Sequence, residues 1–269
     1  MSEAAAVKTC CADLYASDWA HLLLGDSLHP GGLALTQRLG EMLGLGPGAR
    51  VLDIASGRGV SAIHLARHFG CSVLGADYSA ANVLRARDDA GRAGLDGRVT
   101  FTEGDAERLP CADAAFDAVI CECAFCTFPG KAAAAAELGR VLRPGGMAGL
   151  ADLVRRAPLP PGLDDLFAWI ACIADALPAE EYVRHLEAAG LELVTLEDHD
   201  EALAEMARSV RMRQLGAQVA ACLRRIQLPA ADLTRVKEMA RAAERAVIDG
   251  KLGYALILAR KPSGRRGGR

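Results

Sequence analysis

The stretch VLDIASGRG, Val51 to Gly59, joins an apolar strand to a turn that carries two spaced glycines. Glycine has no Cβ, so Gly57 and Gly59 let the backbone approach a ligand closely. A helix beginning near Val60 then offers its unpaired N–H groups to the same ligand. The loop predicts a nucleotide or nucleoside site, although GRGVSA also satisfies the dinucleotide pattern G-x-G-x-x-A.

Outward from this loop, short aliphatic runs alternate with helical stretches. Helices are expected at residues 61–69, 80–93, 131–142, 162–176 and 179–189. Strands are expected in RVLDIA, SVLGAD, RVTFTEGD, FDAVICE, GMAGLADLV, LELVTLE and GYALILARK. Strands separated by helices indicate βαβ units, so the sequence predicts an α/β fold with a Rossmann-like, mostly parallel sheet.

The flanking segments read as additions to one domain, because 269 residues are near the size at which a single core stops growing. Residues 1–45 predict an N-terminal helical cap. Residues 46–260 form the main domain, with a helical insertion at 198–250 before the last strand, and residues 261–269 predict a disordered basic tail. In the cap, HPGG at residues 29–32 has two interpretations: a lid in which Tyr15 and His29 close over the ligand, or a Pro/Gly turn with a surface histidine.

The composition is that of an ordinary globular protein. With 31 Lys plus Arg against 34 Asp plus Glu, nothing indicates a nucleic-acid partner. No run approaches the roughly 20 apolar residues of a spanning helix, and the N-terminus lacks a basic segment followed by an apolar one, so we expect no membrane contact and a cytoplasmic location. Nine cysteines in that compartment stay reduced, which leaves packing, metal binding and catalysis as their uses.

Asp77 ends the strand that lies about twenty residues after the glycine loop, where a carboxylate can accept both hydroxyls of a ribose. Together with EGDAERLP at 103–110, FDAVICE and RVLRPGG at 140–146, it makes the chain resemble the class I S-adenosylmethionine-dependent methyltransferases, whose last strand is antiparallel. The resemblance implies S-adenosylmethionine as cofactor, with Asp105 accepting from the adenine amine and Ala106 donating from its backbone. The implied cofactor-binding residues are Asp53, Ala55, Gly57, Gly59, Asp77, Tyr78, Asp105, Ala106 and Cys121. Ala55 departs from the family, which usually has a glycine there.

Glu122 ends the fourth strand, which lies near the reacting methyl group in this family. Its carboxylate is either a general base for the acceptor or a hydrogen-bond partner of the cofactor or of a backbone N–H. Strand alternation is expected to send Cys121 and Cys123 to one face and Glu122 to the other.

The cysteines raise a question about the acceptor. The spacing C-x-C-x-x-C at residues 121–126 falls short of a structural zinc site, and buried packing also explains such cysteines. Cys172, in AWIACIADALPAEEYVRHLEAAG, resembles the corresponding stretch of the arsenite methyltransferases, a branch near the UbiE-like enzymes. The resemblance implies that Cys172 and Cys222, with Cys10 or Cys11, hold a metalloid substrate, and that Cys123 and Glu122 take part in catalysis. Cys222 falls in a predicted helix with no matching motif.

Three functions therefore remain open. The first is methylation of thiol-bound arsenite or a related metalloid, with a reduced thiol as co-reactant, because soft thiolates select soft acceptors. The second is methylation of a small organic molecule at carbon, nitrogen or oxygen, as in relatives acting on quinones or secondary metabolites. The third is a cofactor- or metal-binding protein that transfers nothing.

Overall fold

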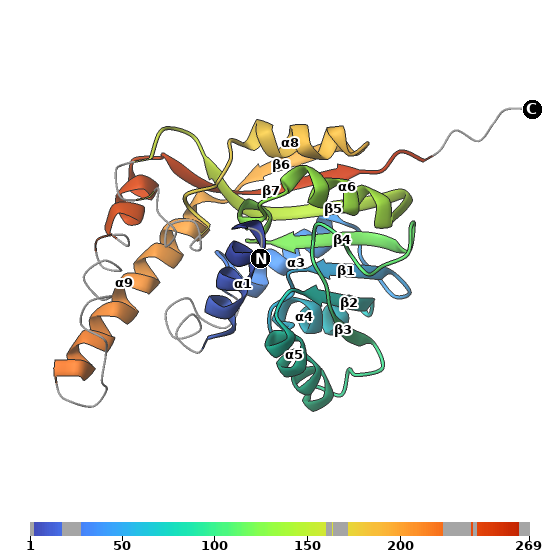
Figure 1. Ribbon diagram of the computed structural model, residues 1–269, viewed down its shortest axis with the longest axis horizontal. Helices are drawn as coiled ribbons and strands as arrows, with labels where there is room; N and C mark the ends of the chain where they lie inside the picture. Colours follow the sequence, from blue (N-terminus) through green and yellow to red (C-terminus); the bar gives the residue numbers. More distant parts are fainter. Residues whose placement is uncertain are drawn as a thin grey trace, which may run out of the picture.

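The computed structural model describes residues 3–17, 28–159, 163, 172–222, 238 and 241–263, and the side chains at residues 3, 4, 14 and 214–222 lie outside this description. Seven strands form one sheet in the order β3-β2-β1-β4-β5-β7-β6 (Figure 1). The strands are β1 (Arg50–Ile54), β2 (Ser72–Asp77), β3 (Val99–Glu103), β4 (Phe116–Glu122), β5 (Leu142–Arg155), β6 (Glu192–Asp198) and β7 (Leu252–Arg260). The predicted α/β, Rossmann-like sheet is confirmed.

Strand direction follows the expected pattern. The strands β1 to β5 pair in parallel, and β7 inserts antiparallel between β5 and β6. Parallel strands end at one edge, so the residues after β1, β2 and β4 meet where the chain order reverses from β1 to β4. This edge holds the site described below.

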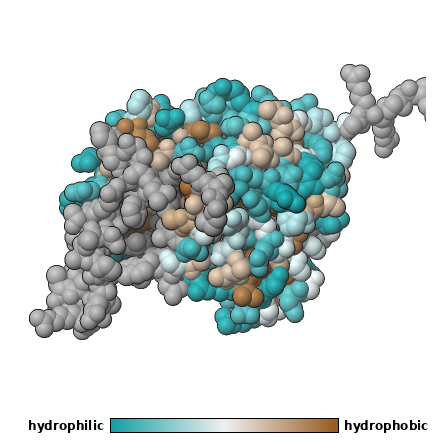
Figure 2. All heavy atoms as spheres, viewed as in Figure 1, coloured by the Kyte–Doolittle hydropathy of each residue, from teal (hydrophilic) through white to brown (hydrophobic). Residues whose placement is uncertain are grey.

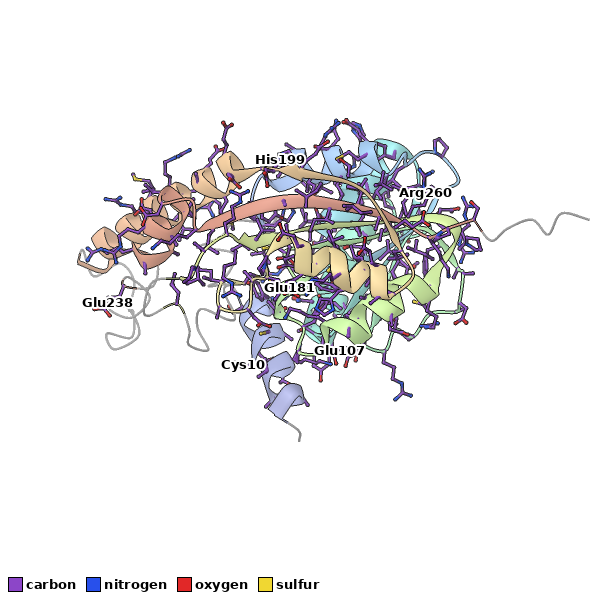
Figure 3. The ribbon with its side chains drawn as sticks, turned by 90° about the horizontal axis from the view of Figure 1, so that it is seen from above. Cys10, Glu107, Glu181, His199, Glu238 and Arg260 are labelled. Atoms are coloured by element: carbon purple, nitrogen blue, oxygen red, sulfur yellow. The ribbon has the colours of Figure 1, made fainter. Side chains whose placement is uncertain are left out.

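Helices cover both faces of the sheet, as expected of parallel strands (Figures 1 and 3). α3 packs on α4, and α5 packs on β2 and β3, whereas α6 packs on α8. The described helices are α1 (Glu3–Ala16), α3 (Gly32–Met42), α4 (Val60–Phe69), α5 (Ala80–Arg92), α6 (Lys131–Val141), α8 (Ala179–Ala188) and α9 (Asp200–Cys222), with a short 3-10 turn, η1 (Phe125–Thr127).

The predicted elements match closely, with a few differences. β5 is longer than predicted because it begins at Leu142, directly after α6. The helix expected at 162–176 falls mainly on residues outside the description, as does much of the insertion at 198–250, of which α9 is the first part. The division into cap, domain and tail stays a prediction.

On the face shown in Figure 2, the coloured part of the surface is mostly hydrophilic, with apolar residues scattered in small groups. Within the described ranges, the structure contains no helix with the length and apolar character needed to cross a bilayer.

Candidate active site

A pocket opens at the carboxyl ends of β1, β2 and β4, with α1 across its mouth. Its floor comes from the loops after these strands and from the loop after β3. Its cover comes from α1 and from Leu28 and His29, which precede α3. The lining residues include Asp53, Ala55, Gly57, Asp77, Tyr78, Asp105, Ala106, Glu122 and Cys123 from the loops, and Lys8, Cys11, Ala12, Tyr15, Leu28 and His29 from the cap. Most of the predicted cofactor residues are therefore brought together.

The glycine loop is built on left-handed backbone angles. Gly57 has φ 55° and Gly59 has φ 77°. A Cβ on Gly59 would lie 2.4 Å from the Phe101 ring, so only glycine fits. Ala55 also has a positive φ, of 58°, which explains why the resembled family places glycine there and implies strain of about 1 kcal/mol in this chain.

Asp53 at the end of β1 is buried and lines the pocket. Burial, followed by the nearby carboxylates of Glu122 and Asp77, raises its pKa well above the ordinary value. Neither Asp53 Oδ2 nor the buried Ser56 Oγ meets a hydrogen-bond partner in the described part of the chain. Two orphaned polar atoms facing a pocket fit a ligand that carries a cationic donor group, as S-adenosylmethionine does.

Asp77 fixes the glycine loop from the end of β2. Its Oδ2 accepts from the N–H of Gly57 at 2.7 Å, and its Oδ1 accepts from the N–H of Ser79 at 2.8 Å and from Asn82 at 3.3 Å. Burial raises the pKa of Asp77, and these hydrogen bonds oppose the rise. These hydrogen bonds use three of the roughly four acceptor sites of a carboxylate, so one site on Oδ2 is left for a ligand. Tyr78 follows at the mouth, 42% exposed.

Asp105 faces the cap. Its two oxygens accept from Lys8 Nζ at 3.0 and 2.8 Å, and Oδ1 also accepts from the N–H of Glu107 at 3.0 Å. Lys8 also pairs with Glu107 at 2.7 Å. Burial works to lower the pKa of Lys8, but the two carboxylates outweigh it and raise the pKa.

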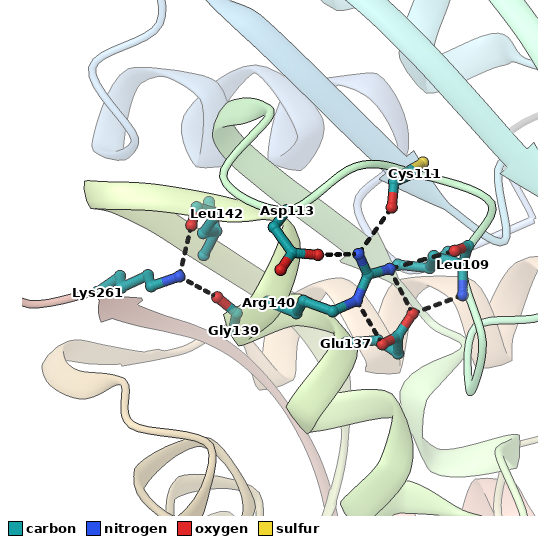
Figure 4. Close-up of polar contacts among 8 residues, drawn as sticks. All are labelled: Leu109, Cys111, Asp113, Glu137, Gly139, Arg140, Leu142 and Lys261. Atoms are coloured by element: carbon teal, nitrogen blue, oxygen red, sulfur yellow. Dashed lines mark hydrogen bonds and ion pairs between the residues drawn. The ribbon is translucent and has the colours of Figure 1, made fainter.

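Arg140 anchors the segment that follows Asp105 (Figure 4). Its guanidinium donates to Glu137, to Asp113 and to the carbonyls of Leu109 and Cys111. Nearby, Lys261 donates to the carbonyls of Gly139 and Leu142, both at 2.7 Å. Arg140 of RVLRPGG therefore holds a loop in place and does not line the pocket.

Glu122 sits at the inner end of the pocket in a polar network. Its side chain is 5% exposed and accepts from Thr36 Oγ1 at 3.0 and 3.1 Å and from Ser61 Oγ at 2.6 Å. His29 Nε2 lies 3.7 Å from Glu122 Oε2, and His29 Nδ1 lies 3.2 Å from the Pro30 carbonyl. His29 is buried and lines the pocket, so the surface-histidine interpretation of HPGG is wrong.

Three cysteines and a tyrosine meet beside Glu122. The thiols of Cys123 and Cys126 donate to Cys172, and Tyr15 Oη lies 3.5 Å from Cys172 Sγ. These donors lower the pKa of Cys172, whereas the pKa values of Cys123 and Cys126 are raised. When Cys172 is neutral, its own proton goes to the Cys123 carbonyl at 3.1 Å. Cys172 is therefore the member of the cluster that most readily becomes a thiolate.

Several cysteine predictions need correction. Cys121 is fully buried and does not line the pocket, which argues against cofactor contact. Glu122 and Cys123 do not point to opposite faces but both line the pocket, because β4 ends at Glu122 and Cys123 takes φ 53°. Cys11 reaches the pocket and Cys10 does not; burial raises the pKa of Cys11 to about 11.

The predicted metalloid ligands, Cys172 and Cys222 with Cys10 or Cys11, stay a prediction. The side chain of Cys222 lies outside the description. Among the described residues, no three His, Cys, Asp or Glu side chains are arranged to hold a metal ion. Sequence reasoning assigned no role to Lys8, Thr36 or Cys126. Lys8 lies 97 residues from Asp105, Thr36 lies 86 residues from Glu122, and Cys126 lies far along the chain from Cys172, so only the folded structure reveals these contacts.

Comparison with known proteins adds independent findings. Residues 51–146 match the family model described as a methyltransferase domain. The chain is 34% identical over 232 residues to 27-O-demethylrifamycin SV methyltransferase of Amycolatopsis mediterranei. The aligned region covers 85% of this chain and 83% of that protein. It is 29% identical over 191 residues to an arsenite methyltransferase of Halobacterium salinarum, across 70% of this chain and 49% of that protein. The crystal structure of the (4+2)-cyclase SpnF superposes with a TM-score of 0.74 at 27% identity, covering 94% of this chain and 96% of the other.

Proposed function

The chain belongs to the class I S-adenosylmethionine-dependent methyltransferases and is an enzyme of the small-molecule type, and on that premise we propose that its acceptor is a hydroxyl group of a small organic molecule. The observation that carries the proposal is the buried pair of Glu122 and His29 where the pocket reaches the end of β4. A hydroxyl must lose its proton to become a good nucleophile, and this pair can take it. The relative from Amycolatopsis, by its name, also methylates an oxygen.

The cofactor supplies an electrophilic methyl group on a sulfonium. We assign its ribose hydroxyls to Asp77 and its adenine amine to Asp105, with the backbone N–H of Ala106 as a donor to the ring. The orphaned Oδ2 of Asp53 would accept from the ammonium of the methionine portion. Gly57 and Gly59 let the backbone come close to the ligand, and Ala55 and Tyr78 complete the contact surface.

In this proposal His29 accepts the proton of the hydroxyl group, and Glu122 stabilises the imidazolium that results. The Pro30 carbonyl accepts from Nδ1–H, which selects the tautomer whose Nε2 is unprotonated. Nε2 accepts the acceptor's hydroxyl proton as the oxygen attacks the methyl group. The imidazolium that forms lies 3.7 Å from the Glu122 carboxylate, which Thr36 and Ser61 hold in place. The products are the methyl ether, S-adenosylhomocysteine and one proton on His29.

The test uses S-adenosylmethionine with a labelled methyl group and a panel of hydroxylated polyketides, phenols and terpenoid alcohols. We expect label in an ether-linked product of at least one compound. Glu122→Gln should then lower kcat about 10²- to 10⁴-fold while cofactor affinity changes little, whereas Glu41→Gln, on the exposed side of α3, should leave kcat unchanged. Transfer of label to carbon or nitrogen only, or full activity of Glu122→Gln, would rule the proposal out. If no label moves and a substrate is isomerised, the activity resembles that named for SpnF.

A second candidate acceptor is thiol-bound arsenite, and the hydrogen bonds that join Cys123, Cys126 and Cys172 favour it, although the three thiols are not arranged as a metal site in the described structure. Arsenic(III) is bound by two or three soft thiolates, and Cys172 readily loses its proton. The arsenic lone pair would take the methyl group, and a reduced thiol co-reactant such as glutathione would reduce the arsenic(V) product. Cys172 and Cys126 lie behind the pocket wall, so the cluster would have to open toward Cys123 to take the substrate.

The two candidates separate in one assay. The protein is incubated with S-adenosylmethionine, arsenite and glutathione, and methylated arsenic is measured by chromatography. Activity that Cys172→Ser abolishes and Cys111→Ser retains would support the metalloid. Absence of methylated arsenic with the wild-type protein eliminates it.

A further inference from the structure

Helix α1 lies across the mouth of the pocket. Four of its residues, Lys8, Cys11, Ala12 and Tyr15, line the pocket. In Figure 1, α1 lies at the carboxyl end of β4, and Figure 3 shows α1, marked by Cys10, beside the loop that carries Glu107. A nucleoside held by Asp77 and Asp105 would therefore lie beneath this helix.

The first tie that holds α1 comes from Lys8, near the middle of the helix. Its ammonium contacts Asp105 at 2.8 Å and Glu107 at 2.7 Å, and its side chain is only 15% exposed. Glu107 is itself fixed, because it accepts from the N–H of Gly130 at 2.7 Å. The tie thus joins α1 to the carboxylate assigned to the adenine amine.

The second tie is at the C-terminal end of α1, where the carbonyl of Ala16, its last residue, accepts hydrogen bonds. Arg58 donates to this carbonyl at 3.2 Å, and Arg85 donates to it as well. Arg58 belongs to the glycine loop and Arg85 to α5. Cationic groups at the C-terminus of a helix also interact favourably with its dipole.

Between the ties, α1 also packs against the pocket. Cys11 is buried, and Tyr15 contacts the core and lies 3.5 Å from Cys172 Sγ, whereas the other described side chains of α1 are half-buried or exposed. A helix that buries little apolar surface opens at a lower cost in free energy than a core helix. The polar contacts of Lys8 and of the Ala16 carbonyl therefore add to this packing in keeping α1 closed.

A count of lone pairs shows that Lys8 and a nucleoside can share Asp105. Oδ1 accepts two hydrogen bonds, from Lys8 and from the N–H of Glu107, and Oδ2 accepts one, from Lys8. A carboxylate offers about four such sites, so one remains on Oδ2 for an amine. Lys8 can stay in place when the ligand is bound.

We infer that Lys8 is a positioning residue for the cofactor: it fixes Asp105 and Glu107, closes α1 over the nucleoside and sets the rate at which the nucleoside exchanges. Opening α1 breaks the ion pairs of Lys8, so release of S-adenosylhomocysteine is slowed by their strength. The inference concerns the cofactor alone and holds whatever the acceptor is.

The experiment measures association and release of S-adenosylhomocysteine by surface plasmon resonance on the full chain. Lys8→Met is expected to speed release about tenfold, which corresponds to about 1.4 kcal/mol. Lys8→Arg keeps the charge and should restore most of the slow release. Lys251→Met removes a lysine paired with Asp249 before β7 and serves as the matched control with unchanged release.

Salt provides a readout that needs no variant. Release from the wild-type protein should quicken between 0.05 and 1 M NaCl, on the order of severalfold, because salt screens the ion pairs, and release from Lys8→Met should not. Hydrogen exchange of α1 amides should slow on ligand binding in the wild type and much less in Lys8→Met. Salt-independent release from the wild type, or equal release from wild type and Lys8→Met, would overturn the inference.

Discussion

Replacing Asp77 by asparagine tests how the cofactor loop is built. The carboxylate accepts from the N–H groups of Gly57 and Ser79 and from Asn82. An asparagine keeps one acceptor oxygen and turns a donor group toward the other N–H, so one backbone N–H loses its partner. The ribose hydroxyls lose a charged acceptor in the same step.

The magnitudes follow from these losses. A hydrogen bond to a charged group contributes about 1.5–3 kcal/mol, so the Kd for S-adenosylhomocysteine should rise about 10- to 150-fold. The unpaired N–H costs about 1–3 kcal/mol of stability, which lowers Tm by roughly 2–10 °C in a chain of this size. The fold should survive, because the loss is confined to one turn.

The assay is isothermal titration calorimetry with S-adenosylhomocysteine, together with thermal unfolding followed by circular dichroism. Asp89→Asn is the matched control, since Asp89 lies on the exposed side of α5 and pairs with Arg92. A Kd within twofold of wild type in a folded Asp77→Asn variant would refute the assignment of the ribose to Asp77.

Three further results are expected. Ala55→Gly should raise the free energy of unfolding by about 0.5–1 kcal/mol, because glycine accepts φ 58° without strain, and a drop in urea midpoint would contradict this. Arg140→Met should lower the free energy of unfolding by about 2–4 kcal/mol, more than Arg143→Met, whose side chain is half exposed; equal effects in urea titrations would disprove the anchoring role. Asp152 lies buried on β5 and accepts from the N–H groups of Cys126 and Leu153. Burial, followed by the nearby Cys172, raises its pKa from 3.8 to about 7, so between these two values the folded form holds a proton that the unfolded form has lost. The stability that this proton contributes is therefore lost as the pH rises from about 4 to 7, and stability is level above pH 7. The free energy of unfolding of Asp152→Asn, relative to that of the wild type, should therefore rise by up to about 4 kcal/mol between pH 4 and pH 7. If the two free energies of unfolding change with pH in the same way, Asp152 is not a buried neutral acid.

The sheet and the cofactor loop could be predicted because their signals are local. A strand followed by Gly57 and Gly59, with Asp77 one βα unit later, fixes both the turn and the edge at which it opens. The antiparallel β7 came from resemblance and is confirmed.

The part of the pocket next to the end of β4, where we place the methyl acceptor, could not be predicted in the same way. Glu122 meets Thr36 and His29 only because α3 packs beside the end of β4, and no periodicity encodes contacts over 86 residues. Cys123 lines the pocket together with Glu122 because its φ is 53°, and nothing in the sequence predicts a positive φ at this residue. Cys123 and Cys172 were both singled out by resemblance, whereas their contact with each other and with Cys126 became evident only from the folded structure.

The most direct measurement is a crystal structure of the protein soaked with S-adenosylhomocysteine. We expect the ribose on the carboxylate of Asp77, the adenine amine on that of Asp105 beneath Lys8, and the sulfur facing Glu122. A nucleoside bound away from the ends of β1, β2 and β4, or a thioether sulfur turned from Glu122, would contradict the account.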